Sequence, residues 1–525
     1  PIAASGSVIQ FELGLADFDL IGFDPRGVDR SGGLVCVDDE FQDEHLYLDD
    51  TPDTPEEEAL LDEADTGFVE GCRERYGDSL RFYSTENTAR DMDLIREALG
   101  DDQLSYLGIS YGTYLGAVYA TMFPERVRAM VLDSAFEPND DTVEQQYLTQ
   151  LVGFENAFNS WVEWCETDRA CEFTGDDVAA RWDALREQLD ETPVPGDDGR
   201  MANQAVLDTA TTSALYSEAS WPVLGQALAA AERGDGAPLF ALADSYAGRN
   251  PDGTFDTLSQ SNVIISCASG FTSAPPDDPE ALLEKMRAEA PRFSEGITLD
   301  NLTDDTDECE GLVTDVEATP ISYAGDGPVV VIGGTNDPAT PIRWAEEMTA
   351  EMGPNARLVR YNGEGHGQLL GSSCVTEVMA DVLGDLDLPD EGTVCEPDPA
   401  VERPEWWGEL PVPDGIGEVV SLPALNAALG LTDTLGYGEA RVTDLPADEA
   451  VEVIDGALDD AGFRGLGSQD IPIDGTEDRV YITPDGEALL VLVMSPEAFE
   501  TDELASAAAS VPEGKTIVLM VYLPQ

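Results

Sequence analysis

The stretch Gly108-Ile109-Ser110-Tyr111-Gly112 has the form G-x-S-x-G and decides how the rest of the sequence is interpreted. Residues 104–109 ahead of it read as a strand, and the apolar segment behind it reads as a helix reaching Phe123-Pro124. A serine at such a strand-to-helix turn is pushed out of the sheet, and the flanking glycines supply the space and backbone freedom that the turn needs. This context, more than the short motif itself, indicates that Ser110 is a nucleophile.

A serine nucleophile needs a base to take its proton and an acid to orient that base. Both follow in chain order. Asp337 comes directly after a predicted strand at residues 328–333, and His366 lies between two glycines after a predicted strand at 356–361. Asp337 could instead be a turn residue, since aspartate before proline is common in turns. A histidine in a glycine loop is rarely a packed core residue, so we predict that Ser110, Asp337 and His366 form a catalytic triad.

The chain alternates strands and helices on both sides of a long helical segment, which indicates an α/β fold with a parallel sheet. The first part has predicted strands at 17–24, 104–109 and 128–132, a helix at 88–99, and an acidic, loop-like region at 37–65. The helical segment has predicted helices at 142–166, 176–190, 203–215, 220–233 and 278–290. After the second group of strands, residues 396–413 look like a linker. The last part has helices near 446–461 and 500–509 and strands near 478–483, 488–494 and 516–523.

These patterns predict four segments. Residues 1–139 and 321–398 would form the two parts of the α/β core, residues 140–320 a helical insert, and residues 414–525 a small α+β domain. No apolar run approaches the length of about 20 residues that spans a membrane.

The charge balance is extreme, with 107 acidic against 26 basic residues and a formal net charge of -81. Such an excess repels itself, and salt relieves the repulsion by shortening the screening length to about 3 Å near molar concentration. We therefore predict a protein adapted to high salt. The same negative field argues against nucleic acid and anionic membranes as partners.

The cysteine count is even, at eight. Eight cysteines allow on the order of 100 pairings, and sequence does not choose among them. The simplest hypothesis pairs neighbours along the chain, namely 36–72, 165–171, 267–309 and 374–395; buried free thiols are the alternative. Disulfides would indicate an oxidising compartment, so we expect a secreted or cell-envelope protein. The chain begins without Met and shows no signal peptide, which we interpret as a processed or cut N-terminus.

No metal and no cofactor are expected. The chain has two histidines and no C-x-x-C spacing, so the usual zinc ligands are lacking. His45 lies in an acidic segment and is interpreted as a surface residue.

Further matching segments give the chain a specific resemblance. It resembles the tripeptidyl-aminopeptidase and proline-iminopeptidase-like branch of the α/β-hydrolases across most of positions 18–398. Besides the three predicted catalytic positions, the matching segments are Gly22 to Gly27, Thr88 to Asp93, Phe123 to Val127, Val131 to Asp133, Tyr216-Ser217 with Trp221-Pro222, Thr340-Pro341, and Cys374-Val375 with Gly392 to Cys395.

The resemblance implies an α/β-hydrolase sheet, with the insert forming a helical cap over the active site. It also implies exopeptidase action on short peptides with a free amino end. Glu218 is then a candidate for binding the substrate amine, beside Tyr216 and Trp221, although a solvated surface position is the alternative for any one acidic residue. Two departures stand out: Asp29 replaces a glycine, and Ser269 stands where many members have an aspartate.

The family's Gly-Gly-Pro-Gly loop would lie before Pro1, so the Tyr111 amide is the one oxyanion-hole donor that the sequence names. The strands preceding that loop would also be missing. The position between the strand at 18–24 and the strand at 104–109 is therefore expected to be empty.

Two other functions stay open. Members of the same branch act as esterases, so a carboxylesterase is the alternative enzyme. A non-catalytic envelope protein that binds partners through residues 414–525 is the alternative from another class, and the intact Ser, Asp and His argue against it.

Overall fold

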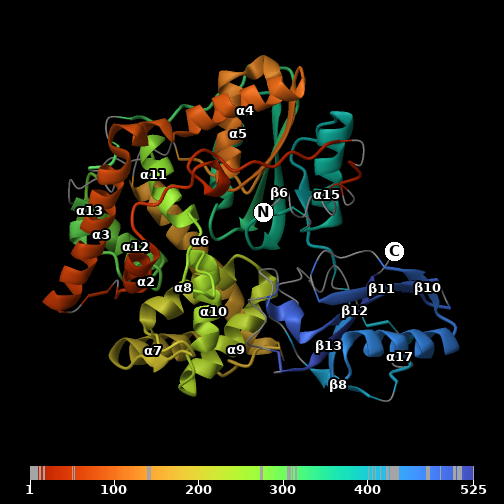
Figure 1. Cartoon of the computed structure of the whole chain (residues 1–525). Helices are drawn as coiled ribbons and strands as arrows, with labels where there is room; N and C mark the ends of the chain where they lie inside the picture. The colour runs from red at the N-terminus through yellow and green to blue at the C-terminus, as the bar shows by residue number, and fades with distance from the viewer. Residues whose placement is uncertain are drawn as a thin grey trace.

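The computed structural model contains an α/β sheet, a helical region and a second sheet formed by the C-terminal part of the chain (Figure 1). The structure describes residues 10, 13–15, 18–49, 51–52, 54–138, 143–168, 170–271, 276–303, 309, 311–313, 316–369, 371–399, 401, 403–404, 406–407, 410–413, 415–420, 422, 425, 437–468, 473, 475–484, 486–500, 504, 511–512 and 514–523.

The first sheet is parallel and has the strand order β1-β2-β5-β6-β7. Its strands are β1 (Leu104–Ile109), β2 (Val127–Asp133), β5 (Val329–Asn336), β6 (Ala356–Glu364) and β7 (Val394–Cys395). Residues 129–132 of β2 are all apolar because both faces of the sheet are covered there. Met130 and Leu132 pack on one face, and Ala129 and Val131 pack on the other.

Helices on both sides cover this sheet. On one face lie α4 (Thr85–Leu99), α5 (Tyr111–Met122) and α14 (Ile342–Met352), and on the other lies α15 (Ser373–Ala380). Figure 1 shows α4 and α5 on one side of β6 and α15 on the other. The α/β-hydrolase type of sheet inferred from the sequence is therefore present.

The predicted strand at 17–24 is wrong for the residues that the structure describes. Residues 18–24 run as irregular backbone, with Leu20, Ile21 and Phe23 exposed. Residue 17 lies outside the described residues. Within the described part of the chain no strand pairs with the outer edge of β1, so the 18–24 segment has no ladder to join. An apolar run does not make a strand unless its N–H and C=O groups find partners.

The acidic region at 37–65 is not a loop. It contains α2 (Asp39–His45) and the first half of α3 (Pro55–Tyr76). Helix α3 begins with a capping box, in which Glu57 N donates to Thr54 Oγ1 and Thr54 N donates to the Glu57 carboxylate, and with proline at its first position. The sequence Thr54-Pro55-Glu56-Glu57 is a helix-start signal. It was missed because the acidic composition of the region favoured a loop.

Helices predominate between β2 and β5. The predicted ones correspond to α6 (Val143–Thr167), α7 (Val178–Glu191), α8 (Gln204–Leu215), α9 (Trp221–Glu232) and α12 (Pro279–Glu289), and α10 (Ala237–Ala247), α11 (Leu258–Ala268) and α13 (Leu299–Thr303) were not predicted. A short hairpin of β3 (Val194–Pro195) and β4 (Met201–Ala202) joins α7 to α8. The part of the chain from α6 to α13 is called the cap region below. Its core is rich in aromatic rings, including Phe158, Trp161 and Trp182.

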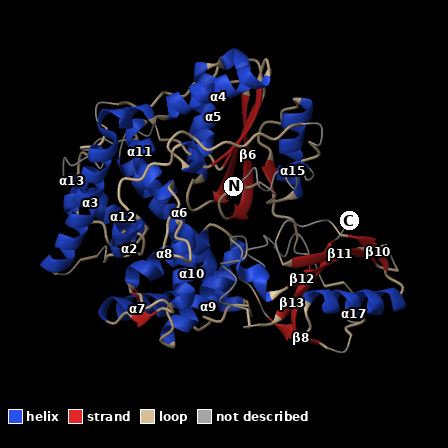
Figure 2. Ribbon diagram, viewed as in Figure 1, coloured by secondary structure: helices blue, strands red, loops and turns tan. Residues whose placement is uncertain are grey.

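The C-terminal part forms a six-stranded antiparallel sheet with the order β10-β11-β12-β13-β9-β8 (Figure 2). Its strands are β8 (Ile416–Val420), β9 (Tyr437–Thr443), β10 (Arg464–Gly467), β11 (Thr476–Ile482), β12 (Ala488–Met494) and β13 (Thr516–Leu523). Helix α17 (Ala447–Asp460) packs on one face, and Val223 of α9 packs with the core on the other. The predicted helix and the strands near 478–483, 488–494 and 516–523 are confirmed. Most of the helix predicted at 500–509 lies outside the described residues.

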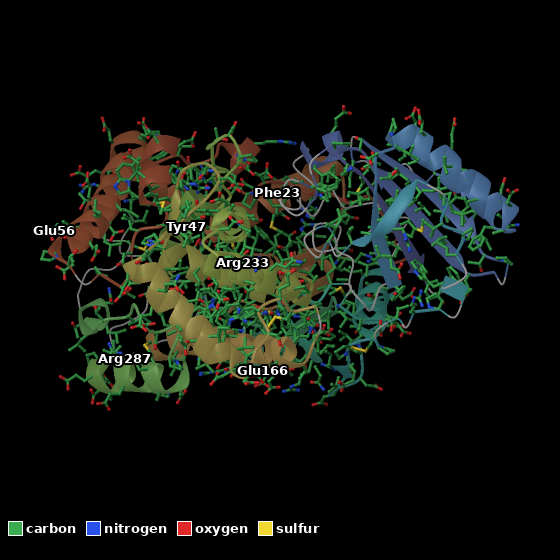
Figure 3. All side chains as sticks on the ribbon, turned by 90° about the horizontal axis from the view of Figure 1, so that it is seen from below. Phe23, Tyr47, Glu56, Glu166, Arg233 and Arg287 are labelled. Atoms are coloured by element: carbon green, nitrogen blue, oxygen red, sulfur yellow. A yellow bond between two sulfur atoms is a disulfide. The ribbon has the colours of Figure 1, made fainter. Side chains whose placement is uncertain are left out.

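The four predicted disulfides are confirmed: Cys36–Cys72, Cys165–Cys171, Cys267–Cys309 and Cys374–Cys395. The first and third belong to one buried cluster, which ties α3 to α11. Figure 3 shows many oxygen-tipped side chains projecting outward from the ribbon, with Glu56 at the tip of α3. None of the described helices is long and apolar enough to cross a membrane.

Candidate active site

Ser110 occupies a strained turn between β1 and α5. It is the N-cap of α5 and has φ 56° and ψ −127°, a left-handed φ that a residue with a side chain rarely adopts. The turn is so tight that a Cβ added at Gly108 would lie 2.4 Å from the carbonyl oxygen of Gly112. Gly108 is thus required by space, whereas a Cβ at Gly112 would meet only Tyr106 Oη at 3.6 Å. The prediction of a strand–turn–helix at Ser110 is confirmed.

Asp337 and His366 form a hydrogen-bonded pair. His366 Nδ1 lies 3.0 Å from Asp337 Oδ1 and 3.1 Å from Oδ2. Asp337 is 2% exposed, and the backbone amides of Ala339 and Thr340 donate to its Oδ1 at 3.0 and 2.9 Å. Burial alone would lower the pKa of His366, but the Asp337 carboxylate outweighs it and holds that pKa above its ordinary value. The pair is therefore built to stabilise a protonated imidazole.

Sequence reasoning assigned no role to Thr340. Its hydroxyl donates to Asp337 Oδ2 at 2.9 Å and lies 3.2 Å from His366 Nδ1. A buried carboxylate needs its lone pairs satisfied, and Thr340 supplies both a side-chain and a backbone donor. Its position in Asp-Pro-Ala-Thr, three residues after the aspartate, was the available signal.

All three candidate residues lie at the carboxyl ends of strands in the same parallel sheet. Ser110 follows β1, Asp337 follows β5 and His366 follows β6, and carboxyl ends of parallel strands share one edge of a sheet. The histidine loop also lies beside the nucleophile turn, because a Cβ added at Gly367 would lie 3.5 Å from Ile109 Cγ2. The fold thus brings together residues that are more than two hundred positions apart in the sequence.

The Tyr111 side chain, next to the nucleophile in sequence, is anchored by buried hydroxyl groups. Its amide stands at the first position of α5, where a helix does not use the backbone N–H groups internally. Its hydroxyl lies 2.8 Å from Thr85 Oγ1, which in turn lies 2.8 Å from Ser269 Oγ. Burial raises the pKa of Tyr111 to about 12, so its hydroxyl stays protonated. Ser269 is fully buried and belongs to this chain of hydroxyls. The serine that the sequence analysis noted in place of an aspartate therefore has a structural role here.

The three predicted substrate-binding residues lie in different surroundings. Tyr216 contacts His366: its carbonyl accepts from the His366 amide at 2.9 Å, and the two rings meet edge to face at 5.2 Å. Glu218 is exposed, at the start of a short 3-10 helix, Glu218–Ser220. Trp221 is only 4% exposed and packs against Trp164 in the cap core. This burial shows that Trp221 is a core side chain. The match at Tyr216-Ser217 and Trp221-Pro222 could not separate a core residue from a substrate-binding one.

The other singled-out residues have structural surroundings. Asp29 adopts φ 36°, a left-handed conformation that favours glycine and that aspartate tolerates, and Thr257 Oγ1 donates to its carboxylate at 3.2 Å. His45 is half-buried at the end of α2, stacked on Phe41 and hydrogen-bonded to the Phe41 carbonyl.

The cap docks directly on the loop that carries Asp337. Gln150 Nε2 donates to the Ala339 carbonyl at 2.7 Å, and a Cβ added at Gly153 would lie 2.7 Å from the Pro338 carbonyl oxygen. A cavity of about 320 Å³ opens beside this contact, lined by residues that include Asp337, Lys285 and Arg343. Across the described residues no cluster of three or more His, Cys, Asp or Glu side chains could hold a metal ion.

Comparisons with known proteins agree with this geometry. The chain is 32% identical over 394 residues to the serine protease Hip1 of Mycobacterium tuberculosis, and the alignment covers 72% of this chain and 74% of that protein. It is 30% identical over 397 residues to the tripeptidyl aminopeptidase of Streptomyces coelicolor, covering 74% and 71%. It is 34% identical over 402 residues to carboxylesterase B of Mycobacterium tuberculosis, covering 75% and 77%.

The family model described as the alpha/beta hydrolase fold matches residues 4–372, a span that includes Ser110, Asp337 and His366. Because that match extends over well more than half of the chain, the protein belongs to the α/β hydrolase family.

Proposed function

We propose that this chain is a serine peptidase that cleaves short peptides from a free N-terminus through an acyl-enzyme. The observation that carries the proposal is the buried hydrogen-bonded pair of His366 and Asp337 at the sheet edge where the strained Ser110 turn projects. A histidine oriented by a buried carboxylate, on the sheet edge that also carries a strand-end serine, is the arrangement that activates a hydroxyl for attack.

In the proposed reaction Ser110 Oγ attacks the scissile carbonyl carbon while His366 takes the hydroxyl proton. Asp337 accepts the Nδ1–H bond and offsets the positive charge that develops on the ring, in keeping with the raised pKa of His366. The Tyr111 amide donates to the oxygen that becomes negative. His366 then returns the proton to the leaving amine, and water releases the acyl group from Ser110.

The relatives named serine protease and tripeptidyl aminopeptidase support peptides as the substrate class. We propose that Tyr216 lines the site next to His366 and that Glu218, exposed two residues further on, binds the substrate's amino group. Trp221 would support this segment from within the cap core. Nucleic acid is an unsuitable partner for a chain with a net charge of -81.

The test is a matched set of tripeptide anilides, one with a free amino end and one acetylated, assayed with the wild type, Ser110→Ala and Glu218→Gln. Release from the free form, its loss in Ser110→Ala and a raised KM in Glu218→Gln are the expected results. Equal cleavage of free and acetylated peptides would overturn the exopeptidase assignment.

A carboxylesterase is the second candidate, favoured by the 34% identity to carboxylesterase B. Esters that lack an amine separate the two functions. If such esters are cleaved far faster than the free tripeptides, the protein is an esterase and the proposed peptidase function is wrong. If neither class is cleaved and Ser110 is not labelled by a fluorophosphonate, the chain is a binding protein that kept the fold.

We also propose a location outside the cytoplasm, at the cell envelope or beyond, and adaptation to high salt. Four disulfides among eight cysteines require an oxidising compartment to form and persist. The excess of acidic residues is the basis for the second proposal.

A further inference from the structure

The end of β2 carries two fully buried polar residues that the proposed mechanism does not use. Asp133 and the adjacent Ser134 are both 0% exposed, between the ends of β1 and β5. Burying a carboxylate is costly unless hydrogen bonds compensate for lost water. Ser134 adds a second cost, because it is a non-glycine residue with φ 55°. A buried carboxylate and a strained backbone in adjacent residues both cost stability. Their explanation lies in the groups to which these two residues are hydrogen-bonded.

The two side chains bind the loop that carries His366. The Asp133 carboxylate accepts from Gln368 N at 3.0 Å through one oxygen and from Leu369 N at 2.8 Å through the other. Ser134 Oγ accepts from Gly367 N at 2.8 Å. The three consecutive amides that follow His366 are therefore held by one dipeptide.

The backbone of the same dipeptide holds the other two parts of the site. The carbonyl oxygen of Asp133 accepts from the amide of Ser110 at 3.0 Å. The amide of Ser134 donates to the carbonyl of Ile332, on the strand that leads to Asp337, at 2.9 Å. Asp133 thus binds the nucleophile through its main chain and the base-bearing loop through its side chain.

We propose that Asp133 and Ser134 are positioning residues that set the placement of the His366 imidazole relative to Ser110. The inference rests on the proposed function of that pair. It assigns the buried carboxylate a task that a neutral amide does not perform, since asparagine would accept from one of the two amides and point its own N–H groups at the other.

The surroundings of Asp133 agree with a charged acceptor. The pKa of Asp133 is raised to about 6, because the effect of burial, with a smaller contribution from Asp337, exceeds the opposite effect of the Gln368 and Leu369 amides and of His366. The carboxylate is therefore ionised at neutral pH. Its negative charge also faces His366 and contributes to the raised pKa of that ring.

The test combines kinetics with a spectroscopic measurement on His366. Asp133→Asn is expected to lower kcat about 100-fold and to leave KM within about threefold, because a misplaced base slows the reaction without weakening substrate binding. Ser134→Ala, which keeps the backbone and removes one acceptor, is expected to lower kcat about 10-fold. Asp478→Asn is the matched control: it neutralises another buried aspartate, in the C-terminal sheet, and should leave kcat unchanged.

The chain has two histidines, so isotope-labelled histidine in a His45→Gln background reports on His366 alone. In the parent protein the ring should show one tautomer, protonated at Nδ1 toward Asp337. In Asp133→Asn and Ser134→Ala the signals should indicate a mixture of tautomers or exchange broadening. This readout needs no substrate, so it tests the positioning role even if the peptidase assignment fails.

A wild-type kcat together with an unchanged His366 spectrum in Asp133→Asn would overturn the proposal. If Asp133→Asn does not fold, the same two measurements on Ser134→Ala decide. A loss of kcat in Asp478→Asn equal to that in Asp133→Asn would also overturn it, since the effect would then be general destabilisation.

Discussion

The backbone amide of His366 donates to the carbonyl oxygen of Tyr216 at 2.9 Å, and the phenol ring stands edge to face on the imidazole at 5.2 Å. Tyr216 caps the C-terminus of α8, so this contact joins the cap to the candidate base. The next amides of the same loop donate to Asp133 and Ser134. The loop that carries the imidazole is therefore bonded both to the cap region and to the sheet.

Removing the Tyr216 ring should disturb the base. Tyr216→Ala is expected to lower kcat/KM about 3- to 10-fold, the range that corresponds to one lost edge-to-face aromatic pair. Tyr216→Phe is the control, because it keeps the ring and loses only the contact of the hydroxyl with Tyr246 Oη at 3.5 Å. Steady-state kinetics on one peptide anilide distinguish the two variants. Equal activity of the alanine and phenylalanine variants would show that the ring does not orient His366.

Ser110 should react with a fluorophosphonate, as activated serines do. Ser110→Ala is expected to abolish labelling and to lower kcat about 10⁶-fold. His366→Ala should abolish labelling as well, since the hydroxyl loses the base that accepts its proton. Labelling is measured by intact mass and peptide mapping. A probe adduct that persists in Ser110→Ala would exclude this serine as the nucleophile.

The pH dependence should reflect the raised pKa of His366. The base must be neutral to accept a proton, so kcat/KM should rise with pH and reach half its maximum above 6.5, the ordinary histidine value. Asp337→Asn removes the main cause of the raised pKa, so its midpoint should fall, and kcat should fall about 10⁴-fold. Asp133, with a pKa of about 6, titrates in the acidic part of the same pH profile of kcat/KM. A parent midpoint below that of Asp337→Asn would contradict this electrostatic assignment.

Those parts of the site that depend on chain order could be predicted from sequence. Ser110, Asp337 and His366 each follow a strand, and a parallel sheet places such positions along one edge. Helices α6 to α9 were predicted from the long helical periodicity of their sequences. The cysteine pairs were predicted by joining neighbours along the chain.

Contacts that depend on three-dimensional packing could not be predicted in this way. Asp133 is one of 107 acidic residues, and its role comes from amides more than 230 positions away. Trp221 belongs to a helix whose buried face is apparent only once α6 and α9 are packed together. The segment at 18–24 is apolar enough for a strand, but pairing depends on a neighbour that the described residues do not supply.

A disulfide that closes a longer loop should stabilise the protein more than one that closes a shorter loop. Cys267–Cys309 closes a separation of 42 residues and Cys165–Cys171 one of 6 residues, and all four cysteines are buried to a similar degree. In the chain-entropy model the larger loop contributes about 4 kcal/mol and the smaller about 2 kcal/mol. Double alanine variants of each pair, compared by denaturant unfolding, should therefore differ by about 2 kcal/mol. A larger loss from the Cys165/Cys171 variant would show that local packing, and not loop closure, dominates.

Salt should stabilise the folded chain. With 107 acidic and 26 basic residues, most carboxylates have no cation to pair with, and their mutual repulsion acts against the compact state. The screening length falls from about 10 Å at 0.1 M to about 3 Å at 1 M, so repulsion between exposed carboxylates should fade over that range. Partly buried pairs such as Arg292–Glu155, 2.8 Å apart, are screened less and should persist.

The expected result is a melting temperature that rises between about 0.1 M and 2 M potassium chloride. Sucrose, which strengthens apolar burial without screening charge, is the control that separates the two effects. If the chloride and sucrose curves rise alike, burial and not charge is responsible, and the acidic composition needs another cause. A melting temperature that stays flat or falls in potassium chloride would contradict adaptation to high salt, because the repulsion that the composition implies would then have no measurable effect on the folded state.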